Sequence, residues 1–143
     1  MSSHIQKQSR PGFTLIEILI AVAIVVIIGA IAAPMYFTYK KQAAIDATKS
    51  SLKGISLAIE QFQTNVGQYP ETLLDLVRRP TNEELAKDWS GALLKGKDVP
   101  KDGWKNPFQY RLTPEAEHPY ELYSYGSRGR SAPQSEWISV WQQ

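Results

Sequence analysis

Apolar positions follow two different patterns along the first 66 residues. Every residue from Ile18 to Ala33 is apolar or glycine, and no charge follows until Lys40. Together with Phe13–Ile16, this run approaches the roughly 20 residues that a helix needs to span a bilayer. Farther along, apolar residues recur at spacings of three and four, which predicts one apolar stripe on a helix. The stripe consists of Leu52, Ile55, Ile59, Phe62 and Val66.

These patterns predict one long helix from Phe13 to about Thr64. The helix is apolar on all sides in residues 13–35, which we assign to a membrane, and apolar on one side in residues 36–66. Pro34 should disturb it, because proline removes a hydrogen bond and clashes with the preceding turn. Gly67 and Pro70 predict its end.

The remaining residues, 67–143, predict a small globular region. Glu71–Arg79 reads as a short helix that ends before Pro80, and Asn82–Trp89 adds a further turn. Three strands with mixed aromatic and polar residues follow, as a half-buried antiparallel sheet requires. They are Phe108–Leu112, Glu121–Tyr125 and Trp137–Trp141. The predicted fold class is α+β, with the long N-terminal helix packed on a short helix and a three-stranded antiparallel sheet.

Composition excludes several classes of function. The 143 residues include 16 basic and 14 acidic side chains and no cysteine. Removal of residues 1–12 takes away Lys7 and Arg10, which leaves 14 of each sign and no electrostatic reason to expect nucleic acid as a partner. The absence of cysteine excludes disulfides and thiolate metal sites.

Glu17 lies at the front of the apolar run. A charge near the bilayer centre costs about 2.5–3.5 kcal/mol, and intramembrane carboxylates usually mark function. Cleavage after Gly12 would create a positive amine on Phe13, four residues away, in the same chain or a neighbour. A conventional secretory signal cleaved after Ala32 is the alternative. Glu17 within the apolar region and the helical pattern that resumes afterwards both argue against it.

The segment Gly12-Phe13-Thr14-Leu15-Ile16-Glu17 resembles the class III signal of type IV pilins and type II secretion pseudopilins. The resemblance implies that a prepilin peptidase cleaves between Gly12 and Phe13 and methylates Phe13. It also implies that Glu17 pairs with the amine of the preceding subunit during assembly. Neutralisation of Glu17 by its own N-terminus is the simpler alternative. Pro34 would be a point where the helix loses regularity as subunits pack, or a plain kink.

Two further segments resemble the major pseudopilin of type II secretion. Residues 104–110 read W-K-N-P-F-Q-Y, similar to that family's W-G-N-P-Y-Q-Y, and residues 120–126 read Y-E-L-Y-S-Y-G. The resemblance implies a single-pass inner-membrane protein with its C-terminal region in the periplasm. It implies a homopolymer, the pseudopilus, that drives export of folded proteins across the outer membrane. The implied partners are minor pseudopilins, the prepilin peptidase and an assembly platform with a cytoplasmic ATPase.

Two other functions stay open at this point. A type IV pilus subunit shares the N-terminal signal, but the absence of cysteine and the W-K-N-P-F-Q-Y segment count against it. A monomeric, membrane-anchored periplasmic binding module has no evident use for Glu17. Catalysis has little support, because the sequence lacks the motifs of common hydrolases and nucleotide-binding enzymes. We therefore expect a structural protein and not an enzyme.

One loop departs from the pseudopilin pattern. The family usually binds calcium after the Y-S-x-G strand with several aspartates, whereas residues 127–136 contain no aspartate. Calcium needs six to eight oxygen ligands and favours carboxylates. Because Glu136 is accompanied by Arg128 and Arg130, we expect no calcium and no other cofactor. We expect an arginine to pair with Glu136 or to donate to loop carbonyls instead.

Overall fold

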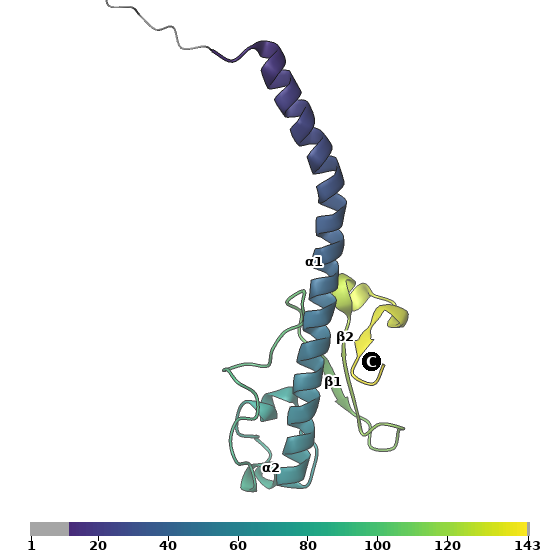
Figure 1. Ribbon diagram of the computed structural model, residues 1–143. Helices are drawn as coiled ribbons and strands as arrows, with labels where there is room; N and C mark the ends of the chain where they lie inside the picture. Colours follow the sequence, from purple (N-terminus) through teal and green to yellow (C-terminus); the bar gives the residue numbers. More distant parts are fainter. Residues whose placement is uncertain (1–11, 143) are drawn as a thin grey trace, which may run out of the picture. The chain divides into compact units, whose positions relative to one another are not determined.

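In the computed structural model, residues 12–142 are described, so the predicted leader lies outside the described residues except for Gly12. The long helix α1 extends from Leu15 to Val66 (Figure 1). The chain divides into two compact units, one ending at Tyr39 and the other beginning at Lys40. α1 ends where predicted, since Gly67 adopts a φ of 84° and its N–H donates to the carbonyl oxygen of Gln63 at 2.8 Å. A glycine in this left-handed conformation is a common helix terminus.

The predicted stripe of α1 forms one side of the hydrophobic core in the second unit. Four of its five residues are fully buried or nearly so, and Val66 is partly buried. They pack with apolar residues from the rest of the unit. The other fully buried side chains include Leu76, Leu85, Tyr120 and Leu122.

Two short helical elements follow α1. The first is a 3-10 turn at Leu73–Leu76, and the second is α2 at Glu83–Lys87. The prediction of a helix over Glu71–Arg79 is therefore too long. Pro80 disfavours helical backbone at the residue before it, so little more than one turn forms.

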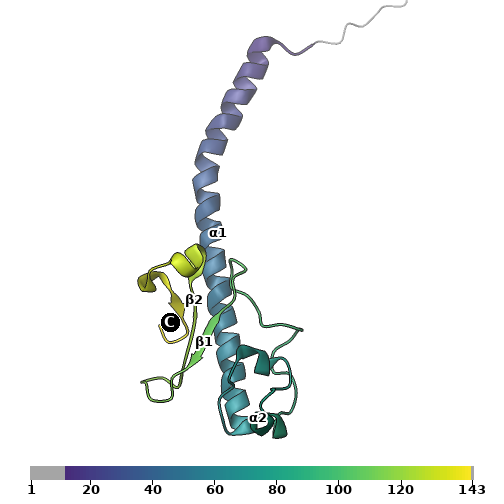
Figure 2. The same cartoon turned by 180° about the vertical axis from the view of Figure 1, so that it is seen from behind.

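A three-stranded antiparallel sheet completes the unit and confirms the predicted fold class. β1 is Gln109–Leu112, β2 is Tyr120–Ser124 and β3 is Ile138–Ser139, in the order β1-β2-β3. Two 3-10 segments, Gly126–Ser131 and Gln134–Glu136, connect β2 to β3. Figure 2 shows β1 and β2 beside the second half of α1.

Two tyrosines of the sheet connect it to α1 and to the segment that follows α1. The hydroxyl of Tyr120 lies 2.9 Å from Ser56 Oγ and donates to Glu60 at 3.3 Å, and the hydroxyl of Tyr110 donates to the carbonyl oxygen of Pro70 at 2.7 Å. Burial raises the pKa of Tyr120 to about 12 and raises the pKa of Tyr110 well above its ordinary value. Both hydroxyls therefore stay protonated wherever the fold is intact near neutral pH.

Candidate functional site

α1 begins with a capping box formed by Thr14 and Glu17. The backbone N–H of Thr14 donates to Glu17 Oε2 at 3.3 Å, and the backbone N–H of Glu17 donates to Thr14 Oγ1 at 3.2 Å. The reciprocal pair satisfies two amides that have no partner within the helix. Glu17 Oε1 makes no hydrogen bond within residues 12–142, so this oxygen is available to a further cation. The sequence interpretation missed Thr14, although T-x-x-E before an apolar run is the signal of a capping box.

The predicted cleavage site lies immediately before this capping box. Gly12 and Phe13 are outside any helix or strand, and Phe13 is 83% exposed. Among the described residues, a Cβ at Gly12 would meet no atom within 4 Å. An enzyme could therefore reach the peptide bond between Gly12 and Phe13.

The first half of α1 presents an apolar surface with no partner among the described residues. It contains a segment long and apolar enough to cross a membrane, with a mean hydropathy of 3.1 and no buried residue. The side chains are about half exposed or more. Examples are Leu15, Ile20, Val26, Ile28 and Ile31. Burial of apolar surface releases about 25 cal/mol per Å², so this segment requires lipid or other helices around it.

α1 continues through Pro34 without interruption. Proline lacks an N–H, so the carbonyl oxygen of Ala30 loses its donor within the helix. One turn later, the hydroxyl of Thr38 donates to the carbonyl oxygen of Pro34 at 3.1 Å. The predicted disturbance is therefore limited to a missing hydrogen bond, and the helical backbone itself is retained.

In the loop that departs from the pseudopilin pattern, an ion pair links the first part of the loop to its last residue. Arg128 Nη1 lies 3.3 Å from Glu136 Oε1, with both side chains substantially exposed. The hydroxyl of Ser131 donates to the carbonyl oxygen of Arg128 at 2.9 Å, and Trp137 Nε1 donates to that of Ala132 at 3.0 Å. Arg130 forms no ion pair within residues 12–142. The only carboxylate of this loop is thus already neutralised by a guanidinium.

A buried aspartate that the sequence interpretation did not single out joins residues 102–106 to the end of β2, where this loop begins. Asp102 is 5% exposed, and its Oδ2 accepts the hydroxyl of Ser124 at 2.6 Å. Its Oδ1 accepts the backbone N–H groups of Trp104 at 2.9 Å and Asn106 at 2.8 Å. Ser124 Oγ in turn accepts the N–H of Gly126 at 3.0 Å. Three hydrogen bonds compensate the burial of this carboxylate.

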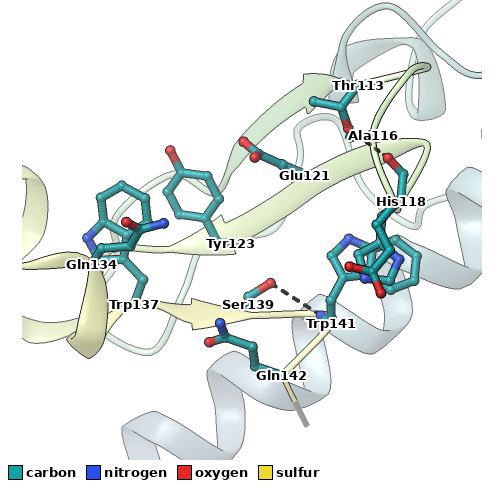
Figure 3. Close-up of a pocket in the computed structure, with 11 residues that line it drawn as sticks. Thr113, Ala116, His118, Glu121, Tyr123, Gln134, Trp137, Ser139, Trp141 and Gln142 are labelled. Carbon is teal, nitrogen blue, oxygen red and sulfur yellow. Dashed lines mark hydrogen bonds between the residues drawn. The ribbon is translucent and has the colours of Figure 1, made fainter.

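A shallow hollow of about 300 Å³ lies on the outer face of the sheet (Figure 3). Two stacked ring pairs line it: Tyr123 with Trp137 at 4.5 Å, and His118 with Trp141 at 4.1 Å. Burial raises the pKa of Tyr123. In the described part of the chain, no hydrogen bond joins the His118 ring to a hydroxyl or a carboxylate. The hollow therefore shows no hydrogen-bonded acid, base and nucleophile of the kind that hydrolases use.

Two family models match this chain in adjacent regions. The model described as "Type II secretion system (T2SS), protein G" matches residues 35–141, and the "Prokaryotic N-terminal methylation motif" matches residues 7–33. The second match includes Gly12, Phe13 and Glu17. The two matches together cover both the assembly segment and the globular region.

Comparisons with individual proteins agree with the family models. Type II secretion system core protein G from Pseudomonas aeruginosa is 36% identical over 87% of this chain and 89% of its own length. The protein of that name from Vibrio cholerae is 28% identical over 87% and 86%. Type IV major pilin protein PilE1 from Neisseria gonorrhoeae is 38% identical, but over only 43% of this chain and 38% of its own length.

A solved structure resembles the fold. The major pseudopilin from the type 2 secretion system of enterohaemorrhagic Escherichia coli gives a TM-score of 0.59. The similarity covers 75% of this chain and 94% of the other at 18% identity. At 18% identity, this similarity is evidence for the shared fold alone.

Proposed function

Because this chain belongs to the type II secretion system protein G family, we propose that it polymerises into a pseudopilus that supports export of folded proteins across the outer membrane. The observation that carries the proposal is Glu17 at the exposed start of α1, whose first half is otherwise apolar. A type IV pilus subunit is the second candidate, and two matches that support it cover less than half of the chain.

Maturation would begin at the accessible bond between Gly12 and Phe13. A prepilin peptidase would cleave there and methylate the new amine. The match to the methylation motif supports this step. The subunit would remain anchored in the inner membrane by the first half of α1, with residues 40–143 in the periplasm.

Assembly would bury the apolar half of α1 against neighbouring helices instead of lipid. A carboxylate and an amine that meet in lipid neutralise each other, so the cost of placing each charge in the membrane falls. Glu17 can serve the capping box through Oε2 and the amine of a neighbouring Phe13 through Oε1. The local and intermolecular roles of Glu17 are therefore compatible.

The pseudopilus would need further proteins to grow. Minor pseudopilins would be further partners, and an inner-membrane assembly platform with a cytoplasmic ATPase would supply the energy. Family membership supports these partners.

Three variants separate the charge of Glu17 from its capping role. Glu17→Gln keeps an acceptor for the Thr14 amide but removes the charge, Glu17→Leu removes both, and Thr14→Ala removes half of the capping box but keeps the charge. We expect both Glu17 variants to lose pseudopilus assembly and Thr14→Ala to keep it. Electron microscopy of sheared filaments and the secreted fraction of a folded substrate measure assembly and export.

Normal filaments from Glu17→Gln would show that the charge is not required, and the pairing mechanism would then be wrong. Absence of filaments in the wild type with the secretion machinery present would contradict the subunit function. Export that improves with Glu17→Leu would favour a monomeric anchored module, since removal of a charge eases membrane insertion.

We further propose that the protein needs no calcium. The loop of residues 126–136 offers a single carboxylate, Glu136, and Arg128 occupies it at 3.3 Å. Melting temperatures in millimolar calcium and in chelator should agree. Arg128→Gln should lower the free energy of unfolding by less than about 1 kcal/mol, because exposed ion pairs contribute little. A clear rise of the melting temperature with calcium would overturn this proposal.

A further inference from the structure

Charge resumes abruptly where the apolar half of α1 ends. Lys40 and Lys41 are the first charged residues after Glu17, and Tyr36 and Tyr39 precede them. Aromatic residues favour the membrane interface, whereas lysines are usually enriched on the cytoplasmic side of a span. Lys40 and Lys41 lie at the opposite end of the span, where this enrichment does not account for them. Any anionic groups that they bind must therefore lie at that end of the span.

A basic loop packs on α1 one turn beyond these lysines. The N–H of Gly103 donates to Thr48 Oγ1 at 2.9 Å, and Thr48 Oγ1 donates to the carbonyl oxygen of Ala44 at 2.8 Å. Lys40 and Lys41 precede Ala44 by four and three residues, so they lie on the same face of α1. Lys101 and Lys105 lie two residues on either side of Gly103 in this loop, and both are exposed.

The hydrogen bonds of Asp102 bring a second basic segment to the same region. Asp102 accepts the hydroxyl of Ser124, which in turn accepts the N–H of Gly126 at the start of the 3-10 segment. That segment carries Arg128 and Arg130. Both views of the ribbon show it beside α1, at the end of the second unit where the chain enters from Lys40 (Figures 1 and 2).

The result is a basic cluster with little internal neutralisation. It consists of Lys40, Lys41, Lys101, Lys105, Arg128 and Arg130. Arg128 pairs with Glu136, but no ion pair within residues 12–142 involves the other five side chains. Of the acidic residues in the same segments, Asp102 is buried and accepts the hydroxyl of Ser124, and Asp46 accepts the side-chain amide of Gln42.

We propose that the basic cluster binds the phosphate groups of anionic phospholipids in the leaflet next to Lys40, while the subunit is still single in the membrane. Lys40 directly follows the interfacial tyrosines in the chain. Ala44, where the basic loop is attached, follows Lys40 by about 6 Å of helix, within the roughly 8 Å over which charges act in physiological salt. Basic side chains next to a membrane span are attracted to anionic headgroups.

Lipid binding would hold residues 40–143 close to the membrane surface until a neighbouring subunit replaces the lipid. Every basic residue of the cluster lies in the second unit, so the proposal depends on membrane anchoring and not on polymerisation. Loss of filaments in the Glu17 variants would leave it unaffected.

Lysine acetylation of the full chain in nanodiscs tests the proposal. One set of nanodiscs contains phosphatidylcholine alone, and the other contains 30% phosphatidylglycerol. We expect reactivity at Lys40, Lys41 and Lys105 to fall at least threefold with phosphatidylglycerol and to recover in high salt. Lys87 in α2 and Lys95, which lie outside the basic cluster, should react equally in both.

A pair of matched variants tests retention of lipid. Lys40→Gln/Lys41→Gln/Lys105→Gln and Lys87→Gln/Lys95→Gln/Lys97→Gln remove the same charge from different places. After extraction in neutral detergent, the first variant should retain several-fold less labelled phosphatidylglycerol than the wild type, and the second should retain the same amount. Added inorganic phosphate in neutral nanodiscs should protect none of the lysines.

Equal lysine reactivity in the two nanodiscs would overturn the proposal, as would equal loss of lipid from both variants. Protection by inorganic phosphate alone would indicate a site for a free anion, which would also contradict it.

Discussion

At the scale of single residues, Lys105 adopts a conformation that favours glycine. Its φ is 67°, and it is the only residue other than glycine with a positive φ in residues 12–142. The pseudopilin pattern that this segment resembles has glycine at the same position, between tryptophan and asparagine. A side chain in the left-handed region costs about 1–2 kcal/mol. The lysine is therefore retained at a cost in stability, which fits a role for its charge.

We predict that Lys105→Gly stabilises the globular unit by about 0.5–1 kcal/mol, because relief of this strain exceeds the added entropy of the unfolded chain. Lys105→Ala is the control, since it removes the charge and keeps the strain. Chemical denaturation of the full chain in detergent measures both free energies. Equal stability of the glycine and alanine variants would show that the backbone is not strained.

At the scale of elements, Gly103 lets the loop of residues 102–106 approach the backbone of α1. A Cβ at Gly103 would overlap the carbonyl group of Ala44. Backbone atoms cannot move aside as the end of a flexible side chain can. Gly54 lies on the exposed side of the second half of α1. A Cβ at Gly54 would meet no atom within 4 Å, so an added side chain fits there without overlap.

Gly103→Ala should destabilise the unit by about 1–3 kcal/mol through overpacking. Gly54→Ala should stabilise it by about 1 kcal/mol, because alanine is the better helix former. Thermal unfolding of the two variants beside the wild type measures the difference. Two variants that both stabilise would mean that the loop does not pack on α1 as described.

The sequence predicted the elements of this fold better than the contacts between them. Period-3.6 spacing predicted the buried stripe from Leu52 to Phe62, and turn residues separated the three strands. The bonds from Asp102 to Ser124 and from Gly103 to Thr48 join residues 22 and 55 positions apart, so no local pattern reveals them. At the candidate site, Glu17 was evident as a charge in an apolar run, whereas its hydrogen bonds with Thr14 were overlooked.

At the scale of the whole globular unit, three tyrosines form a cluster, and one of them, Tyr120, joins the sheet to α1. The Tyr120 ring lies 5.6 Å from the Tyr69 ring and 5.8 Å from the Tyr110 ring, and its hydroxyl contacts Ser56 and Glu60 of α1. Burial raises the pKa of all three tyrosines. Their ionisation therefore couples the stability of the unit to alkaline pH.

The sign of this coupling follows from the proton balance. The pKa of Tyr120 is about 12 in the folded state and 10.0 in the unfolded state, so the folded state binds more protons between these values. The stabilisation is complete below pH 10 and is lost as pH rises toward 12. Two pKa units correspond to about 2.7 kcal/mol in total, and we predict that about 2 kcal/mol of this free energy of unfolding is lost between pH 10 and 12.

Tyr120→Phe identifies the group responsible. The variant loses the hydrogen bonds to Ser56 and Glu60, which should cost about 1 kcal/mol at pH 8. It also removes one ionisation, so its stability should decline less steeply than that of the wild type between pH 10 and 12. Tyr69 and Tyr110 would account for the decline that remains. Parallel pH profiles for the two proteins would show that Tyr120 does not contribute in this window, and that the alkaline loss of stability comes from other groups.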